Sequence, residues 1–298
     1  MKRFGNPGTG ESGYVVKTDN EGNIFVAGEK GDGSVNRDIL TIKYDSSGNF
    51  VWSASYGTYS FDCATDLVCD NVGNVYVTGM SVQQGTAYTT IKYNSIGLQQ
   101  WIAIYTGPDG ASAANSIALD SYGNIFVTGG SNSQNNGSDI ATIKYNNNGV
   151  QQWVHRFNGT GNSEDEGWAI RADINNNIFV VGRTANISHS DAIIIKYSHL
   201  IHAGSENYII PQSFRVHQNY PNPFNPVTKI KFELPETGLL SLNIFDVNGK
   251  KVISKLFDVD APGEYEYDLD LTNFSSGVYF YKISINDFSE IKKMILLK

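Results

Sequence analysis

The stretch Gly22-Asn23-Ile24-Phe25-Val26-Ala27-Gly28 decides the fold, because the chain returns to this pattern at a regular interval. The pattern recurs as Gly73-Asn74-Val75-Tyr76-Val77-Thr78-Gly79, Gly123-Asn124-Ile125-Phe126-Val127-Thr128-Gly129 and Asn176-Asn177-Ile178-Phe179-Val180-Val181-Gly182. A turn residue followed by a short apolar run and a closing glycine is typical of a strand that follows a hairpin turn. Self-similarity at a period of about 50 residues predicts a repeat architecture for residues 1–197.

Two further columns share this period, an Ile-Lys-Tyr triplet and a tryptophan that follows a glycine turn. The triplets begin at Ile42, Ile91, Ile143 and Ile195, and the tryptophans are Trp52, Trp101 and Trp153. Each unit holds four strand-length runs, which in the first unit lie at about 14–19, 24–28, 38–44 and 50–56. Such units predict an all-β fold, a β-propeller-like array of four four-stranded blades. Because one blade cannot bury both of its faces, we expect the aromatic columns to pack between neighbouring sheets.

The ends of the repeat leave two architectures open. Residues 1–6 align with 154–159, a fourth strand, while the last unit ends after its third strand at Tyr197. The N-terminal strand can therefore complete the last blade and close a ring. The alternative is an open array with exposed edges, from which upstream blades have been lost. The units resemble the short bacterial β-propeller repeats of secreted proteins, over residues 1–197.

The last eighty residues have a different pattern, which begins with Tyr220-Pro221-Asn222-Pro223-Phe224-Asn225-Pro226. Three closely spaced prolines hold this stretch extended. Runs of period two follow at 229–234, 240–247 and 278–283, and the chain ends on a strand at 292–298. Turn residues separate these runs, so residues 219–298 predict a small Ig-like antiparallel β-sandwich. Residues 198–218 lack the register of the repeats, and we expect them to form a linker.

This segment resembles the C-terminal type A sorting domain of the type IX secretion system. The resemblance rests on the proline stretch, the Phe-Asp-Val-Asn-Gly-Lys turn, the Ser-Gly-Val-Tyr-Phe-Tyr run and the Lys-Met-Ile-Leu-Leu-Lys end. It implies export across an outer membrane, recognition by the type IX machinery and cleavage near 198–218. The residues that it implies as the sorting signal are Tyr220, Pro221, Pro223, Phe224, Pro226, Gly249, Lys250, Gly277, Lys292, Lys293 and Lys298. The alternative is that these residues only hold the sandwich together.

The expected location is therefore extracellular or on the outer surface of a Gram-negative bacterium. Residues 1–7 carry two basic side chains but no apolar stretch, so no signal peptide is recognisable and we expect the N-terminus to be incomplete. No apolar run is long enough for a transmembrane segment. The net charge of −8 argues against nucleic acid as a partner, since binding needs a basic surface.

Two polar columns are candidates for chemistry. The aspartates Asp19, Asp70, Asp120 and Asp173 each precede a turn, and we expect them to cap it rather than form a ring of carboxylates. The lysines Lys43, Lys92, Lys144 and Lys196 recur on one strand face. We expect a solvated face or packing of their aliphatic stems, with an anion site as the alternative. Cys63 and Cys69 lie at the two ends of one strand, too far apart for a disulfide, and we expect Cys69 to be a buried thiol.

No motif predicts a catalytic residue, a cofactor or a metal. The acidic cluster 164–166 lacks the spacing of a calcium loop and is interpreted as a soluble loop. The five histidines form no His-Glu-x-x-His motif, and His189 with Asp191 and nearby serines is a combination expected by chance. A nucleophile elbow and a phosphate loop are both missing.

We therefore expect an exported, non-enzymatic β-propeller protein for binding or adhesion, whose unknown extracellular ligand is a glycan or a protein. The alternative is a fragment of a secreted, glycosidase-like hydrolase, with its site at the propeller mouth or in a missing N-terminal part. Convergent acids from separate loops leave no local motif, so this alternative stays open. A spacer is a third possibility.

Overall fold

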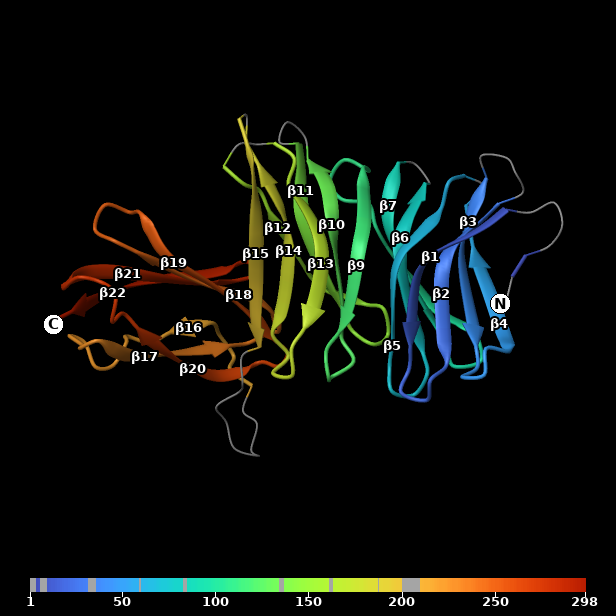
Figure 1. Ribbon diagram of the computed structural model, residues 1–298. Coiled ribbons are helices and arrows are strands. Elements are labelled where there is room, and N and C mark those ends of the chain that lie inside the picture. Colours follow the sequence, from blue (N-terminus) through green and yellow to red (C-terminus); the bar gives the residue numbers. More distant parts are fainter. Residues whose placement is uncertain are drawn as a thin grey trace. The chain divides into compact units, whose positions relative to one another are not determined.

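The computed structural model describes residues 4–5, 10–31, 36–58, 60–82, 85–133, 137–160, 163–186, 188–199 and 210–298 (Figure 1). Every element in these ranges is a β-strand, which confirms the all-β prediction. The chain divides into two compact units. The first unit contains Met1–Ile174 and Ile178–Ile195, and the second contains Asn175–Asn177 and Lys196–Lys298.

The first unit is a series of antiparallel sheets in chain order, which we call blades 1 to 4. Blade 1 contains β1 (Gly10–Thr18), β2 (Ile24–Gly31), β3 (Arg37–Tyr44) and β4 (Phe50–Tyr56). Blade 2 contains β5 (Cys63–Cys69), β6 (Val75–Val82), β7 (Thr86–Tyr93) and β8 (Gln99–Tyr105). Blade 3 contains β9 (Ser112–Leu119), β10 (Ile125–Ser133), β11 (Gly137–Tyr145) and β12 (Gln151–Phe157). Blade 4 contributes three strands of its own, β13 (Glu166–Ala172), β14 (Ile178–Ala185) and β15 (Ser190–His199).

Aspartate caps the turns between the first and second strands, as predicted. Asp19 Oδ1 accepts hydrogen bonds from the amides of Glu21 at 3.0 Å and Asn23 at 2.9 Å. Asp70 and Asp120 hold their turns in the same way. The glycine of the first turn, Gly22, has φ 79°, a conformation that glycine adopts without strain.

Apolar cores lie between consecutive blades. One core joins Phe25, Ala27 and Trp52 of blade 1 to residues of blade 2 such as Leu67 and Tyr93. The next core joins blade 2 to blade 3, and Trp101 packs against it. The prediction that aromatic columns fill the space between sheets is therefore confirmed.

The first and fourth blades are the two ends of this series (Figure 1). Strand contacts join each blade to the next, and among the described residues no comparable packing joins blade 1 to blade 4. The Phe4 ring stacks on Phe50 of blade 1 at 5.9 Å, so this part of the N-terminal segment lies on blade 1. The described residues thus form the open array, although residues 1–3 and 6–9 of the N-terminal segment lie outside the described ranges.

The second unit is a sandwich of two sheets around one apolar core. One sheet has the order β16 (Arg215–Val216), β17 (Val227–Leu234), β20 (Gly263–Asp270). The other has the order β19 (Lys251–Val259), β18 (Gly238–Phe245), β21 (Gly277–Ile285), β22 (Phe288–Leu296). Their inward side chains alternate with outward ones, as in β17, where Ile230, Phe232 and Leu234 are buried. Tyr197, Ser198 and His199 add to β19 in parallel, which makes this sheet mixed.

Candidate functional sites

The lysine column is buried in the first three blades. Lys43 and Lys92 are each 9% exposed and Lys144 is 2% exposed. Their ammonium groups lie over the rings of Phe25, Tyr76 and Phe126, at 5.2, 5.1 and 5.6 Å from the ring centres. Desolvation lowers the pKa of Lys92. Packing of the stems is therefore confirmed for these three lysines, and a solvated face is found only at the exposed Lys196.

Each of the first two blades also holds a turn of the following blade through its tryptophan and lysine. Trp52 Nε1 and Lys43 Nζ both donate to the carbonyl oxygen of Ser95, at 3.1 and 3.4 Å. Trp101 Nε1 and Lys92 Nζ do the same to the carbonyl oxygen of Asn147, at 2.9 and 3.4 Å. We call this arrangement the turn latch. Lys43 and Lys92 therefore join neighbouring blades through the turn latch.

A row of bulged residues follows the first strands of the four blades. Each of these strands has a register shift that leaves one residue unpaired, and the four residues are Tyr14, Thr65, Asn115 and Trp168. First strands of consecutive blades lie side by side. We call these four residues the bulge row.

Hydrogen bonds between neighbouring strands join the middle of the bulge row. Thr65 Oγ1 donates to the carbonyl oxygen of Ala114 at 2.8 Å, and Asn115 Nδ2 donates to that of Gly167 at 2.9 Å. At the two ends of the row, Tyr14 is 55% exposed and Trp168 is 54% exposed. The row therefore carries polar groups in its middle and half-exposed aromatic side chains at both ends. Sequence reasoning missed it, because a bulge leaves no signal beyond one extra residue in a strand.

In the second unit, the proline segment (residues 219–226) is anchored by buried polar groups. Tyr281 Oη accepts from the amide of Asn219 at 3.0 Å and donates to the carbonyl oxygen of His217 at 2.8 Å. Burial raises the pKa of Tyr281 to about 12, so its hydroxyl keeps the proton that it donates. The Asn219 side chain donates to Thr228 Oγ1 at 2.9 Å. Asn219 and Tyr281 therefore hold the start of the segment in place.

The proline segment then runs along the outer edge of β22. The amide of Phe224 donates to the carbonyl oxygen of Ile295 at 3.0 Å. The amide of Leu297 donates to the carbonyl oxygen of Phe224 at 2.9 Å. Asn222 Oδ1 accepts from the amide of Ile295 at 2.9 Å. Phe224 is only 2% exposed and belongs to the core of the sandwich. The segment thus protects an edge strand that would otherwise offer unpaired backbone groups.

The structure brings most of the expected sorting residues together. Tyr220, Pro221, Pro223, Phe224 and Pro226 belong to the proline segment, and Lys292 and Lys293 belong to β22 beside it. Gly277 pairs with Leu296, and the amide of Lys298 donates to Ser276 Oγ at 3.0 Å.

Gly249 and Lys250 lie in the exposed β18–β19 turn, away from the proline segment along the chain. Phe245 at the end of β18 pairs with Phe280 of β21, and Phe280 pairs with Lys293 of β22. The turn after β18, the start of β21 and the end of β22 therefore lie at the same end of this sheet. That end carries Gly249, Lys250, Gly277 and Lys298. We call these four residues the sheet-end cluster. Among the residues that the structure describes, Tyr220 is the most exposed aromatic one, at 81%.

The polar groups that sequence reasoning set aside have structural roles. Asp165 of the acidic cluster is fully buried and accepts from the amides of Gly159 and Ala185, so the expectation of a solvated loop is wrong for this residue. His189 contacts Ser188 at 3.0 Å and Asp191 at 3.3 Å, but the Ser188 hydroxyl donates to Asn186 Oδ1 within an exposed turn.

Both cysteines are free, as predicted, and Cys69 is half-buried where a buried thiol was expected. Within the described ranges, no group of three or more His, Cys, Asp or Glu side chains is arranged to hold a metal. The same part of the chain has no helix with the length and apolar character needed to span a bilayer.

Two family models match the chain. Residues 218–297 match the secretion system C-terminal sorting domain, and residues 100–137 match the β-propeller repeat. No curated protein matches.

The chain has weak similarity to solved structures. PorZ, a bacterial surface component of the type IX secretion system of Porphyromonas gingivalis, aligns with 13% identity and a TM-score of 0.37, covering 96% of this chain and 39% of PorZ. Dimeric latent PorU of the same organism aligns with 11% identity and a TM-score of 0.24, covering 98% of this chain and 34% of PorU. The tail fiber of Staphylococcus aureus phage P68 aligns with 11% identity and a TM-score of 0.23, covering 96% of this chain and 90% of the fiber chain. Such low scores carry no argument about function.

The two family matches agree with the architecture described above, in which bladed sheets precede a small sandwich. A sorting domain of this kind directs its protein to the cell surface or the medium of Gram-negative bacteria. The chain therefore combines β-propeller repeats with a C-terminal sorting domain of the type IX secretion system, and it is a secreted protein.

Proposed function

We propose that the blades bind an extended extracellular glycan along the bulge row, after the sorting domain has delivered them to the cell surface or the medium. The observation that carries this proposal is the pair of half-exposed aromatic side chains, Tyr14 and Trp168, at the two ends of the row. Flat aromatic faces stack on the apolar faces of sugar rings, and polar neighbours orient the hydroxyl groups.

The polar groups that such a ligand needs lie beside Trp168. Glu166 accepts from Trp168 Nε1 at 3.1 Å and from Asn115 Nδ2 at 2.9 Å, so the indole and the amide share one carboxylate. Arg171 on the same strand is exposed. The first strands that carry the row lie side by side, so the row crosses three steps from one strand to the next. A chain-like glycan can contact both ends of the row, whereas a monosaccharide cannot.

The test is affinity electrophoresis and calorimetry of the full chain with soluble bacterial and plant polysaccharides. Trp168→Ala and Tyr14→Ala should each weaken binding about tenfold or more, the equivalent of about 1.4 kcal/mol. Tyr122→Ala is the matched control, because this tyrosine is 62% exposed but lies in the β9–β10 turn, outside the row. Absence of polysaccharide binding, or equal losses in all three variants, would contradict the proposal. Binding of a protein instead of a glycan would contradict the assigned ligand class.

We further infer that the secretion machinery reads the sheet-end cluster. This inference is supported by the register that gathers Gly249, Lys250, Gly277 and Lys298 from three separate parts of the sequence. Lys250→Glu should reduce the secreted fraction of the chain, while Lys229→Glu, in the opposite sheet, should not. Equal secretion of both variants would contradict a role for the cluster.

A further inference from the structure

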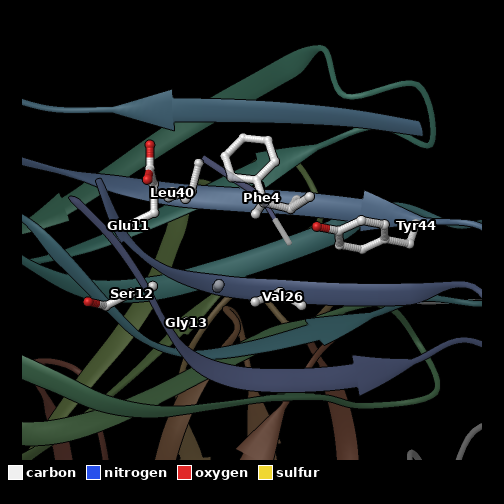
Figure 2. Close-up of a pocket in the computed structure, with 10 residues that line it drawn as sticks. Phe4, Glu11, Ser12, Gly13, Val26, Leu40 and Tyr44 are labelled. Atoms are coloured by element: carbon white, nitrogen blue, oxygen red, sulfur yellow. The ribbon is translucent and has the colours of Figure 1, made fainter. Parts of the chain in front are cut away.

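Two pockets in the described part of the chain differ in chemistry. Figure 2 shows one, of about 140 Å³, whose walls are blade 1 and the Phe4 ring and are mostly apolar. The other, of about 100 Å³, lies between the turns of blades 1 and 2 and is lined mostly by polar side chains. We call this second one the turn pocket. Convergent polar groups in a pocket are typical of a site for a small ligand.

A buried ammonium group lines the turn pocket. Lys43 is 9% exposed, and among the described residues its Nζ atom makes one hydrogen bond, to the carbonyl oxygen of Ser95 at 3.4 Å. An ammonium group has three N–H donors, and a buried donor without a partner costs free energy. Lys43 therefore has donors that a molecule in the pocket can satisfy.

The next interface, between blades 2 and 3, shows what a lysine at this position binds. Lys92 is the counterpart of Lys43 in the lysine column, and its Nζ atom donates to the side-chain oxygen of Asn147. Tyr76 Oη donates to the same oxygen at 3.0 Å, and it lies 3.3 Å from Asp70 Oδ2. In that interface an amide oxygen thus receives two donors beside a carboxylate.

Two replacements remove these groups between blades 1 and 2. Ser95 has the position of Asn147 in the turn, and Phe25 has the position of Tyr76 in the second strand. The amide oxygen and the phenol hydroxyl are therefore both missing beside Lys43. A water molecule's share of liquid volume is about 30 Å³, so the turn pocket has room for a group of several heavy atoms.

The charges around the turn pocket decide which ligand fits. Asp19, Glu21 and Asp70 line it together with Lys43, so three carboxylates face one ammonium group. An anionic ligand is disfavoured by the carboxylates, and a metal cation is disfavoured by the ammonium group in the same pocket. A neutral group that offers an oxygen to Lys43 and an N–H donor to a carboxylate fits best. An amide group has both.

We propose that the turn pocket binds the amide group of a small molecule without net charge, as the next interface binds the amide of Asn147. The amide oxygen accepts from Lys43 Nζ, and the amide N–H donates to a carboxylate of the pocket. Two sources carry this chemistry, the acetamido group of an N-acetylated sugar and the side-chain amide of glutamine. The turn pocket contains no residue of the bulge row, so the proposal does not depend on glycan binding there.

The test is saturation-transfer NMR of the full chain with four probes, N-acetylglucosamine, glutamine, glucose and acetate. At least one of the two amide probes should bind with a Kd of about 1 mM, as a ligand with few contacts does. The stronger of the two identifies the source of the amide. Glucose should not bind because it has no amide, and acetate should not bind because it is negatively charged.

Ser95→Asn should weaken binding of the amide probe at least tenfold, because it places inside the pocket the amide that the ligand supplies. Ser46→Asn is the matched control and should bind like the wild type. Ser46 has the same position in the β3–β4 turn of blade 1 but does not line the pocket. Lys43→Met keeps an apolar stem over the Phe25 ring and should also lose binding, because it removes the ammonium group.

Three results would overturn the proposal. The first is a wild type that binds neither amide probe, which would mean that the turn pocket holds only water. The second is an equal loss of binding in Ser95→Asn and Ser46→Asn. The third is binding of N-acetylglucosamine that persists in Ser95→Asn but is lost in Trp168→Ala, which would place the sugar on the bulge row.

Discussion

At the scale of single residues, the blades depend on a few positions where side chains of one blade touch the backbone of the next. The turn latch is the clearest case, because an indole and an ammonium group share one carbonyl oxygen across the interface. The glycine in the latched turn has to lie against the indole ring. Its conformation and its lack of a side chain are both required, and the two requirements can be separated by experiment.

Gly149→Ala should destabilise the protein more than Gly48→Ala. Both glycines have nearly the same φ, 77° and 76°, so both variants carry the left-handed backbone cost of about 1 to 2 kcal/mol. Only the Cβ at 149 meets Trp101, at 2.6 Å, and overpacking of this kind costs about 1 to 3 kcal/mol more. Denaturant unfolding followed by tryptophan fluorescence measures the difference. Equal losses of stability would show that the close approach to Trp101 does not matter.

His155 should make stability depend on pH in the acid range. Desolvation lowers the pKa of His155 from 6.5 to about 4. The unfolded chain therefore takes up a proton at higher pH than the folded chain, so this contribution to stability is complete above about pH 6.5 and is lost as the pH falls through about 4. The wild type should therefore lose unfolding free energy as the pH falls from about 6.5 to about 4. His155→Gln should reduce this loss by about 1 to 3 kcal/mol.

The matched control for His155 is His189→Gln, because the His189 side chain is 59% exposed. Unfolding free energies at pH 7, 5.5 and 4 should decline with nearly the same slope in His189→Gln and the wild type. A slope in His155→Gln as steep as in the wild type would exclude His155 as the source of the dependence.

At the scale of elements, repeat columns and period-two runs were sufficient to predict most strands. The four runs expected in the first unit became β1 to β4, with ends extended by a few residues. Strands β19 and β20 were not predicted. In β19 the first five residues, Lys251 to Lys255, mix charged and apolar side chains without a clear alternation. The inward face of β19 is defined by contacts with β18, which a local pattern does not contain.

The candidate sites were less predictable than the strands, for physical reasons. A lysine on a strand usually faces solvent, and only the aromatic ring beside it in space explains why Lys92 is buried. The proline segment was recognised from sequence, but its position along β22 depends on the hydrogen bonds of Phe224, about 70 residues from their partners. The bulge row depends on backbone register alone.

Tyr281→Phe should loosen the proline segment. The substitution leaves the carbonyl oxygen of His217 and the amide of Asn219 without their shared partner, and each buried unsatisfied group costs about 1 to 3 kcal/mol. Hydrogen exchange by mass spectrometry should show faster exchange in peptides that contain residues 219–226. Tyr279→Phe is the control, because this hydroxyl donates only to the carbonyl oxygen of Ser275. Unchanged exchange in Tyr281→Phe would exclude Tyr281 as the anchor.

At the scale of the whole molecule, the chain combines two tasks in two units. The second unit carries the sorting domain, and the first presents the repeats that we propose bind a glycan. Sequence patterns left open whether the blades close, because the faces of blade 1 and blade 4 look alike in sequence whether or not they are covered. The structure shows the difference between a covered and an uncovered face, because Val16 is 60% exposed and its counterpart in blade 2, Leu67, is 0% exposed.

The most direct test of the account is an export assay in a Gram-negative bacterium with a functional type IX system. The full chain and a variant that lacks residues 218–298 are each expressed behind the same secretory signal peptide, so that both cross the inner membrane alike. We predict that the full chain reaches the cell surface or the medium and that the truncated chain stays in the periplasm. Retention of the full chain, or its equal release by a strain without the type IX system, would contradict the central claim that residues 218–298 direct this protein out of the cell.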